Sequence, residues 1–389
     1  IVNIFVEYNK YMKILLVGEY SRLHNTLKEG LEKLGHQVFV NGLNDGFKDY
    51  PVDFKIYRKY NKGIISKIKN LVFVLTGFDI SSYATYNQVK HNASRFSGFD
   101  VVQLINENSF MCQPKHEIKI IAFLVKNNTK LFLLSCGDDY VNVDYNFKNP
   151  YRKSVLNPYF EQSSIKKNFV NSLKFRKKSF KKLHEYIYEN CNGVIATDFD
   201  YHLPLLKNSK YLGLIPNPIN STHLKYINLA ITDKIMIFLG LNNQNYYKKG
   251  GNHFEEALSI IKAKYSEKVA IIITQNIPYS TYINLYNNCH ILLDQTYAND
   301  QGYNALEAMA KGKVVFTGAE KEFSDYYNIQ ERVCINAKPD INYLVNELSF
   351  LIENPKEILA ISKRAKAFVE KEHNYIKIAE RYLEVWSNN

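Results

Sequence analysis

Residues 294–318, DQTYANDQGYNALEAMAKGKVVFTG, decide the fold that we expect for this chain. They follow the apolar run of residues 291–293 and continue through a polar loop with Gly302 into a helix and a second apolar run, residues 314–316. Strand, glycine loop, helix and strand form the unit that presents backbone N–H groups at a helix N-terminus to a phosphate. Glu307 is the only acid in this helix and lies one turn in from the loop, where it could reach the sugar hydroxyls of a nucleotide.

The same alternation of strands and helices runs through the chain. Residues 13–18 and 37–40 are predicted to be buried parallel strands on either side of a helix at residues 23–34. Further strands are expected near 101–105, 130–135, 193–196, 234–240, 269–274, 290–293, 313–317 and 332–335, with helices near 118–126, 252–263, 279–287, 303–311, 340–352 and 356–386. Residues 137–165 are expected to be irregular. Such alternation predicts the α/β class with doubly wound parallel sheets.

The chain of 389 residues is long for one hydrophobic core and suits two domains. The run Ile215-Pro216-Asn217-Pro218 is the best boundary, because two prolines in three residues break both a helix and a central strand. We therefore expect an N-terminal Rossmann-like domain at residues 1–215 and a C-terminal Rossmann-like domain at residues 216–370, followed by a terminal helix at residues 371–389.

The amino-acid composition indicates a soluble enzyme without structural disulfides or zinc. Hydrophobic residues make up 46% and charged residues 23% of the chain, as in ordinary soluble enzymes. Five cysteines are scattered without a Cys-x-x-Cys pair, so we expect neither a disulfide framework nor a zinc site. We therefore expect the protein to be located in the reducing cytoplasm. Residues 1–11 lack the layout of a signal peptide and could be an upstream extension or a short extra strand.

Charge is distributed unevenly between the two halves. Residues 1–215 hold 31 Lys and Arg against 19 Asp and Glu, whereas the remainder holds 19 of each, so the whole excess of +12 lies in the first half. Such a half favours phosphate-bearing partners: anionic lipid headgroups, a lipid-diphosphate acceptor or nucleic acid. Since no helix-turn-helix, RNA-recognition or zinc signature accompanies the charge, nucleic acid is not expected as a partner.

The stretch 294–318 resembles the donor-binding signature of retaining, family-four-like glycosyltransferases (glycosyl transferases group 1). In that family a glutamate, seven intervening residues and a second glutamate lead into Ala-Met-Ala-x-Gly and a Val-Val strand. Here Glu307-Ala308-Met309-Ala310-Lys311-Gly312 matches, and Asn299 stands at the position of the first glutamate. The resemblance implies the GT-B fold, in which two Rossmann-like domains face each other across a cleft and the final helix crosses back onto the first domain. It also implies that residues 1–215 form the acceptor-binding domain and residues 216–370 the nucleotide-sugar-binding domain.

The resemblance also implies which residues hold the donor. In the family a glycine-arginine pair and a lysine-glycine pair hold the diphosphate, and here Lys249-Gly250 matches the second pair while Leu241 or Asn242 stands at the arginine position. The loop after the strand at residues 269–274 is expected at the nucleotide base. The full set expected at the donor is Gly18, Glu19, Asn242, Lys249, Asn276, Ile277, Tyr279, Gly302, Tyr303, Asn304 and Glu307. Glu19 is also a candidate base for the acceptor.

Catalytic positions are expected at the ends of the first-domain strands and at the signature. Many relatives carry a histidine in the loop after the strand at residues 101–105, where this chain has Gln103 and Asn106. Asp138, in the next such loop, could orient an acceptor hydroxyl. The expected catalytic residues are therefore Asn299, Asp138 and Asn106.

Asp198-Phe199-Asp200 has the Asp-x-Asp form that binds metal and diphosphate in the other major glycosyltransferase fold. It lies between a predicted strand and helix, so we expect Asp200 to be a helix N-cap. No catalytic metal and no cofactor are expected besides the substrate, a nucleotide-diphospho-sugar of the UDP or GDP type.

A basic helical stretch is expected at residues 165–188, IKKNFVNSLKFRKKSFKKLHEYIY. Its apolar residues share one face, and lysines occupy the rest: Lys174, Lys177, Lys178, Lys181 and Lys182. That composition is typical of an interfacial helix on an anionic membrane, and also of the solvated outer helix of a Rossmann domain. We expect peripheral contact with the inner face of the cell membrane through these lysines.

Together these features predict a retaining glycosyltransferase that moves a sugar to a glycan or a lipid-diphosphate-linked acceptor, in bacterial surface polysaccharide or glycoconjugate assembly. Two alternatives remain open: a nucleotide-sugar epimerase of the same fold, which needs dedicated acids and bases around the sugar, and a catalytically silent homologue that keeps only the nucleotide pocket.

Overall fold

The structure of the protein, a computed structural model, describes residues 11–43, 50–224, 226, 227, 230, 231 and 233–389. The side chains of Tyr279 and Ser280 also lie outside this description. The predicted extension or extra strand at residues 1–11 therefore falls, except for Tyr11, outside the described residues.

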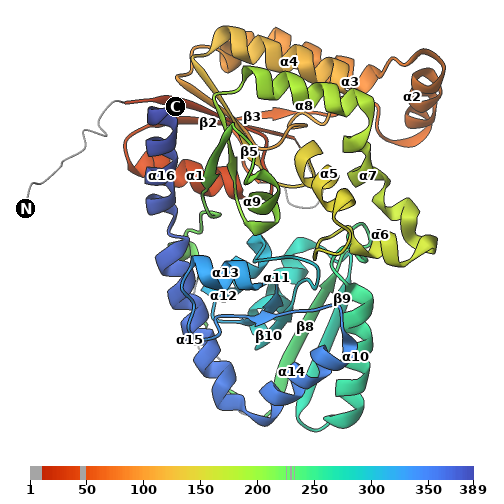
Figure 1. Cartoon of the computed structure of the whole chain (residues 1–389), viewed down its shortest axis with the longest axis vertical. Helices are drawn as coiled ribbons and strands as arrows, with labels where there is room; N and C mark the ends of the chain where they lie inside the picture. The colour runs from red at the N-terminus through yellow and green to blue at the C-terminus, as the bar shows by residue number, and fades with distance from the viewer. Residues whose placement is uncertain (1–10, 44–49, 225, 228–229, 232) are drawn as a thin grey trace, which may run out of the picture.

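Residues 11–43 and 50–214 contribute a sheet of seven parallel strands in the order β3-β2-β1-β4-β5-β6-β7 (Figure 1). Its strands are β1 Lys13–Val17, β2 Gln37–Leu43, β3 Phe54–Ile56, β4 Val101–Leu104, β5 Lys130–Ser135, β6 Gly193–Ala196 and β7 Tyr211–Leu214. The helices of this half are α1 Leu23–Lys33, α2 Gly63–Thr76, α3 Ile80–His91, α4 Pro114–Asn127, α5 Tyr140–Lys148, α6 Asn157–Glu161, α7 Val170–Leu173, α8 Lys178–Asn190 and α9 Phe199–Leu205. The central strand β1 is buried from Ile14 to Val17 because helices cover both faces of the sheet.

The described residues from 233 onward form a second sheet, of five parallel strands in the order β12-β11-β10-β8-β9. Its strands are β8 Ile235–Leu241, β9 Val269–Gln275, β10 Ile291–Leu293, β11 Val314–Thr317 and β12 Ile335–Asn336. The helices are α10 Gly251–Lys264, α11 Tyr279–Asn288, α12 Tyr303–Ala310, α13 Lys321–Tyr326, α14 Ile341–Glu353, α15 Pro355–Glu372 and α16 Tyr375–Asn388. The prediction of two doubly wound, Rossmann-like α/β domains is confirmed.

Parts of the first domain differ from the sequence prediction. Residues 137–165, expected to be irregular, contain α5 and α6. Helix α5 forms because Asp139 caps it, accepting a hydrogen bond from the Asn142 N–H at 2.7 Å. The basic stretch at residues 165–188 is not one helix: Lys177, with extended backbone, separates a 3₁₀ turn from α8. Strands β3 and β7 and helix α3 of this domain, and helix α13 of the second domain, are additional to the prediction.

The linker between the sheets is pinned to the end of the chain. Ile219 donates its N–H to the His373 carbonyl at 2.7 Å, and His373 Nδ1 lies 2.9 Å from the Asn217 carbonyl oxygen. Burial lowers the pKa of His373 to about 4, so its ring is neutral and Nδ1 can donate this bond. The chain thus passes between the two halves twice at one place, once at residues 215–220 and once between α15 and α16.

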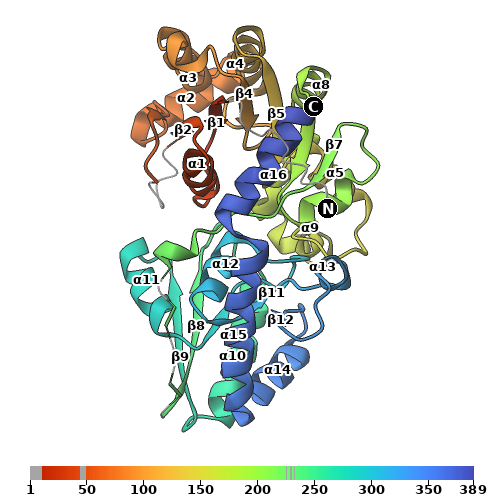
Figure 2. The ribbon, with the colours of Figure 1, turned by 90° about the vertical axis from the view of Figure 1, so that its left-hand side faces the viewer.

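Helix α16 returns to the first domain and packs along α1 (Figure 2). Trp386 on α16 is fully buried beside Phe132 of β5, and Lys130 Nζ donates to the Trp386 carbonyl at 2.8 Å. Gly30 of α1 lies at the closest approach: a Cβ there would be 2.4 Å from the Tyr375 carbonyl oxygen. Every helix among the described residues is too short or too polar to span a bilayer.

Gly30→Ala tests the contact between α1 and α16. Alanine favours a helix by about 1 kcal/mol over glycine, yet the Cβ would push α16 away, so we expect a net destabilisation of about 1–3 kcal/mol. Urea unfolding measures it. Lys33→Ala, at an exposed position of the same helix, should stay within about 0.5 kcal/mol of the unchanged protein. A more stable Gly30→Ala variant would show that the two helices are not in contact.

Candidate functional site

Helix α12 begins where the two sheets meet. Its N-cap residue is Gly302, so the helix begins without a capping side chain of its own, and the N–H groups of its first turn are available to an anion. The Tyr303 hydroxyl lies 2.6 Å from the Thr26 Oγ1 of α1 and donates to the Pro218 carbonyl at 2.8 Å. The start of α12 is therefore held against both the first domain and the linker. Glu307 is half-buried one turn further along.

Lys249 lies beside the start of α12 and is joined to it by a residue that the sequence analysis did not select. Asp294, buried directly after β10, accepts from Lys249 Nζ at 2.9 Å and from Asn304 Nδ2 at 3.1 Å. Lys249 keeps 39% of its side chain exposed. The sequence signal that could have identified Asp294 is a carboxylate at the end of the strand that leads into the expected donor helix. Asp294 orients Lys249 and the first turn of α12 together.

Gly18 ends β1 in a conformation that needs glycine, with φ at +90° and only 2.3 Å between an added Cβ and Ile105 Cγ2. The Gly18 carbonyl accepts from the buried His24 Nδ1 at 2.7 Å, and Gln103 Nε2 lies 3.2 Å from His24 Nε2. Burial lowers the pKa of His24 to about 4, which keeps the ring neutral, as this pair of bonds requires. His24 and Gln103 thus fix the Gly18 loop.

Glu19 follows Gly18 and is buried, with 8% exposure. Its Oε2 accepts from the Asn25 N–H at 2.8 Å and from Asn25 Nδ2 at 2.7 Å, whereas Oε1 has no hydrogen-bond partner among the described residues. Burial raises the pKa of Glu19 to about 7, against the opposing effect of the bonds from Asn25. A carboxyl group that titrates near neutral pH and has one unpaired oxygen can accept a proton from a ligand.

Asp138 and Asn106 have different roles. Asn106 is buried and donates from Nδ2 to the carbonyls of Cys136 and Asp138 at 3.0 and 3.1 Å, so its side chain supports the loop after β5. Asp138 Oδ2 accepts from the Ser172 hydroxyl and forms an ion pair with Lys248 of the second domain at 3.1 Å. The expected catalytic position Asn106 is thus internal to the loop, and Asp138 joins the two domains.

The loop expected at the nucleotide base, after β9, lies beside the loop after β8, where Asn242 stands at the expected position of the diphosphate arginine. Asn276, at φ +49°, donates its N–H to the Leu241 carbonyl at 3.0 Å, and its Oδ1 accepts from the Asn243 N–H at 3.2 Å. Asn242 and Asn276 are exposed and Ile277 is half-buried. Tyr279 begins α11, but its side chain lies outside the described residues.

Asn299, at the position of the first signature glutamate, points to the first domain. Its N–H and Nδ2 donate to Asp200 Oδ1 at 3.0 and 2.5 Å, and Nδ2 also donates to the Lys153 carbonyl at 3.3 Å. An amide can make these bonds, whereas a glutamate would place a second carboxylate against Asp200. The asparagine at this position is therefore explained by the domain contact.

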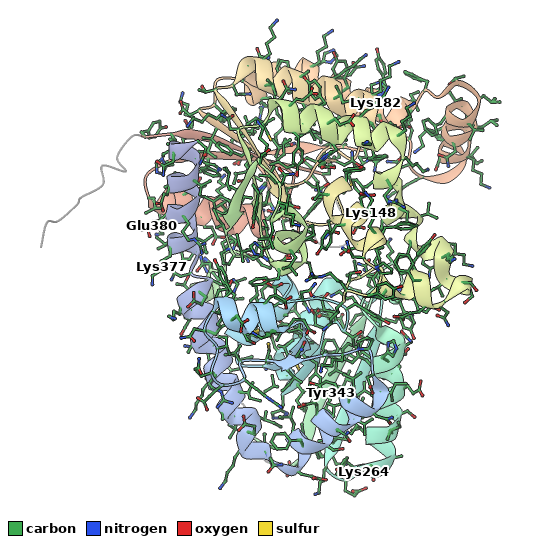
Figure 3. All side chains as sticks on the ribbon, viewed as in Figure 1. Lys148, Lys182, Lys264, Tyr343, Lys377 and Glu380 are labelled. Atoms are coloured by element: carbon green, nitrogen blue, oxygen red, sulfur yellow. The ribbon has the colours of Figure 1, made fainter. Side chains whose placement is uncertain are left out.

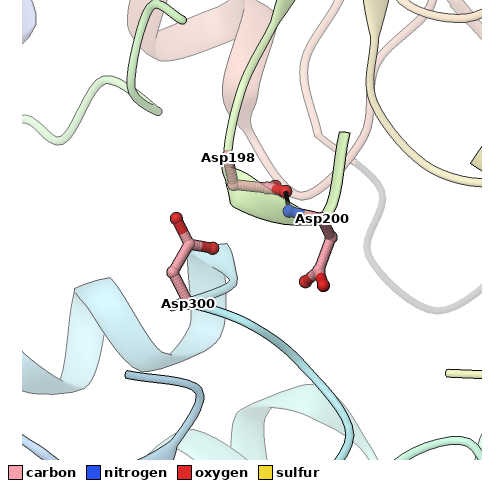
Figure 4. A group of neighbouring side chains, drawn as sticks. All are labelled: Asp198, Asp200 and Asp300. Atoms are coloured by element: carbon pink, nitrogen blue, oxygen red, sulfur yellow. Dashed lines mark hydrogen bonds between the residues drawn. The ribbon is translucent and has the colours of Figure 1, made fainter. Parts of the chain in front are cut away.

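Asp300, next in the chain, brings a third carboxyl group to Asp198 and Asp200 (Figure 4). One oxygen from each lies within 4.8 Å of the others, and among the described residues these three are the group that could hold a metal ion. Asp198 is the N-cap of α9 and accepts from the Asp200 N–H at 3.1 Å, so the cap is Asp198 and the prediction of Asp200 was wrong by two residues. Asp300 accepts from the Phe199 N–H at 3.1 Å through Oδ2, while Oδ1 lacks a hydrogen-bond partner in the described structure.

Burial raises the pKa of all three carboxyl groups, and the neighbouring aspartates raise those of Asp198 and Asp300 further. Hydrogen bonds from backbone and amide N–H groups account for one oxygen on each residue. Protons shared between the carboxyl groups can provide partners for part of the other oxygens, as in other pairs of close carboxyl groups. The cluster joins the domains through the bond from the Phe199 N–H to Asp300, and burial favours the protonated form of its carboxyl groups.

A cavity of about 140 Å³ lies between the domains beside the cluster. It is lined by Asp138, Asn142, Asn146, Val155, Asp198, Asp200 and Tyr201 from the first domain and by Gln295 and Gly302 from the second. Sites that hold drug-sized ligands measure roughly 300–1,000 Å³. This cavity by itself has room for only part of a nucleotide sugar.

The structure brings most of the expected residues to the junction of the domains. The loops at the carboxyl ends of the two sheets, and helix α12 that begins there, carry nine of these residues: Gly18, Glu19, Asp138, Lys249, Asn299, Gly302, Tyr303, Asn304 and Glu307. The basic residues Lys174, Lys177, Lys178, Lys181 and Lys182 belong instead to η3 (Lys174–Arg176) and α8 and the joint between them. Phe180, Leu183 and Ile187 of α8 are buried, so this helix offers charge but no free apolar face.

Comparison with known proteins agrees with this geometry. Residues 247–384 match the model of a family described as glycosyl transferase-like, a range that includes Lys249, Asp294, Asn299, Gly302 and Glu307. No curated protein sequence matches the chain. The chain has the GT-B fold, and the match to the glycosyl transferase-like family covers residues 247–384.

Solved structures of similar fold cover nearly the whole chain. Sucrose-phosphate synthase from Thermosynechococcus elongatus superposes with a TM-score of 0.62 at 14% identity, over 97% of this chain and 99% of that one. HepE of Anabaena, in complex with UDP and glucose, gives 0.59 at 11% identity, over 97% and 100%. A putative UDP-N-acetylglucosamine 2-epimerase from Listeria monocytogenes gives 0.54 at 11% identity, over 96% and 95%. The predicted resemblance to GT-B glycosyltransferases is confirmed.

Asp300→Asn tests the state of the carboxyl cluster. Because the folded protein holds protons here that the unfolded chain releases above its usual aspartate pKa of 3.8, stability falls as pH rises from about that value. The amide keeps an acceptor for the Phe199 N–H and donates to the other carboxylates. We expect Asp300→Asn to stabilise the protein by about 1–3 kcal/mol at pH 8 and by much less at pH 4.5, measured by thermal unfolding.

The control is Asp325→Asn, whose side chain is 62% exposed and outside the cluster and which should change stability little at either pH. If Asp300→Asn instead destabilises the protein at pH 8, and EDTA has the same effect on the unchanged protein, the three carboxylates are ionised around a cation.

Proposed function

We propose that this protein is a retaining glycosyltransferase that transfers a sugar from a nucleotide-diphospho-sugar to a glycan or lipid-linked acceptor. The observation that carries the proposal is the start of α12, where free backbone N–H groups lie with Lys249 and Glu307 inside the region that matches the glycosyl transferase-like family. Such a helix start attracts a diphosphate through aligned N–H groups and the positive end of the helix dipole.

The donor site follows from these residues. The diphosphate would lie against Gly302 and Tyr303 and the ammonium group of Lys249, which Asp294 holds in place. Glu307, one turn along the same helix, would accept hydrogen bonds from the ribose hydroxyls. The loops at Asn242 and Asn276 would contact the base. We infer a UDP-type donor, with GDP as the other candidate, because HepE holds UDP on a similar fold.

Binding requires the domains to separate. The interdomain ion pairs Lys248–Asp138 and Lys153–Glu320 measure 3.1 and 2.7 Å, and the remaining cavity is smaller than a nucleotide sugar. Entry of the donor would break such contacts, and closure would restore them and exclude water from the reacting sugar.

The chemical step that we propose needs no enzyme nucleophile. As the bond between the sugar carbon and the diphosphate lengthens, negative charge grows on the leaving oxygen, and the α12 N–H groups and Lys249 stabilise it. The acceptor hydroxyl attacks from the same face, so configuration is retained. Glu19 accepts the hydroxyl proton, since its pKa near 7 suits a base at neutral pH.

We also propose that no metal takes part and that the protein works in the cytoplasm, in surface polysaccharide or glycoconjugate assembly. Lys249 and the N-terminus of α12 would balance the negative charge of the donor diphosphate. Asp198 already caps α9, and Asp200 already accepts a hydrogen bond from Asn299. All five cysteines are free, which agrees with a reducing compartment.

A nucleotide-sugar epimerase is the second candidate, because the Listeria 2-epimerase shares the fold. Its chemistry would require acids and bases at the sugar, and Glu19 with its unpaired oxygen could serve as one. Incubation with a panel of UDP- and GDP-sugars separates the two. A transferase releases nucleotide when acceptor is present and leaves the recovered sugar unepimerised, whereas an epimerase converts the donor without acceptor.

Lys249→Ala and Glu307→Ala should each weaken nucleotide-sugar binding about tenfold or more, since each removes a charged hydrogen-bond partner worth roughly 1.5–3 kcal/mol. Isothermal titration with UDP-glucose measures it. Lys262→Ala and Glu267→Ala, exposed in the same domain, are the matched controls and should bind as the unchanged protein does. Unaltered affinity in both site variants would exclude the start of α12 as the donor site.

Glu19→Gln should lower kcat/KM by roughly 10²–10⁴-fold at pH 8, the range for loss of a general base. In the unchanged protein kcat/KM should fall as pH drops below about 7, where Glu19 becomes protonated, and the variant should lose this acid limb. The pH–rate profile provides the check, with Glu32→Gln, on the exposed side of α1, as control. An acid limb that persists in Glu19→Gln would assign the base to another residue.

A further inference from the structure

Helix α2 lies at the outer edge of the first domain (Figure 1). All of its residues are described, and none of their side chains is buried. Val74 is 78%, Ile64 75% and Leu75 74% exposed. The other large apolar residues exposed on this helix and just after it are Ile65, Ile68, Leu71, Val72 and Phe78. Single exposed apolar residues are common on soluble proteins, but a contiguous set of this size marks an interaction surface.

The polarity of α2 is inverted. Its half-buried residues Ser66, Lys69 and Phe73 recur at the spacing of one helix face, which is the side turned to the protein. Ile64, Ile68, Leu71 and Leu75 follow the same spacing on the opposite face, which is turned to solvent. Helix α8 shows the ordinary arrangement, with Phe180, Leu183 and Ile187 turned inward. Packing within the domain therefore does not account for the apolar face of α2.

Positive charge surrounds this face. Residues 54–78 contain six Lys and Arg and no Asp or Glu. Arg58, ahead of α2, lies close enough to Lys174 to act on its charge, which brings this basic segment next to η3, the turn that precedes α8. From there the exposed lysines at positions 177, 178, 181 and 182 continue the basic surface, and Lys182 lies on the outer side of the domain (Figure 3).

We propose that α2 inserts its apolar face into the surface of an anionic lipid bilayer, with the surrounding lysines on the headgroups. Fourteen residues make a helix of about 21 Å, shorter than the roughly 30 Å of a hydrocarbon core, so α2 lies in the interface and does not span it. Apolar burial and attraction of Lys and Arg to anionic lipid act together in such helices.

The charge favours a bilayer over the other possible occupants. A second copy of this chain would bring a second acid-free basic segment against the first, which is repulsive. The partner surface must be both apolar and negatively charged over the length of a helix, as an anionic bilayer is. This proposal goes beyond the transferase function and does not depend on catalysis.

The main experiment is co-sedimentation of the full chain with vesicles of phosphatidylcholine alone or with about one third phosphatidylglycerol. We expect binding to the anionic vesicles that weakens with salt, because headgroup attraction is screened. Val74→Ser/Leu75→Ser should reduce the partition coefficient about tenfold or more through lost apolar burial. The matched control is Ile260→Ser/Leu359→Ser, two exposed apolar helix residues of the second domain that should leave binding unchanged.

Two further variants separate the contributions. Lys62→Gln/Lys67→Gln should weaken binding several-fold at low salt, whereas Lys262→Gln/Lys264→Gln should not. These two control lysines lie on α10, and Lys264 is at the far end of the second domain (Figure 3). Leu75→Trp adds an exposed indole to a chain whose single native Trp386 is buried. Its fluorescence should shift to the blue with anionic vesicles and be quenched by brominated lipid.

The proposal is overturned if the full chain does not sediment with anionic vesicles, or if Val74→Ser/Leu75→Ser and its control bind equally. It is also overturned if light scattering shows a dimer that Val74→Ser/Leu75→Ser dissociates, since α2 would then cover a second copy. Because all of these measurements are made without substrate, their failure is independent of the transferase assignment.

Discussion

The carboxyl ends of two parallel sheets meet at one junction, and polar groups gather there because parallel strands leave their last loops at the same edge. Asp138 and Asp198 follow β5 and β6 of the first sheet, and Asp294 follows β10 of the second. Buried polar groups must find partners, and here many find them across the domain boundary. Lys248 pairs with Asp138 and Asn299 bonds to Asp200. The positions of the other site residues depend on this junction.

The same residues that close the domains line the candidate site, so binding and domain motion are coupled. Tyr303, at the start of the anion-binding helix, bonds to Thr26 of α1 and to the linker at Pro218. A ligand at α12 would therefore act on contacts that hold the two halves together. The linker itself is fixed to the α15–α16 junction through His373, so a change in domain angle must pass through these two crossings.

Two basic segments of the first domain have similar compositions but differ in which side chains are buried. Residues 165–188 and 54–78 are both rich in lysine and apolar residues. In the first, Phe180, Leu183 and Ile187 of α8 enter the domain core and the lysines of this helix are left on a solvated face. In the second, the apolar side chains face outward. Apolar exposure, and not lysine content, distinguishes a surface that can enter a lipid interface.

The sequence by itself determined the two α/β domains, most of the strands and the donor helix, because apolar runs, glycine turns and the 294–318 signature are local patterns. It also indicated Lys249 and Glu307. Only the tertiary structure showed that Asn299 bonds to Asp200, that Asp300 joins Asp198 and Asp200, and that Asp294 holds Lys249. Except for the last, these pairs link segments about a hundred residues apart, which no local pattern encodes. Which face of α2 meets the protein was likewise decided by packing, since periodicity marks a stripe without saying what covers it.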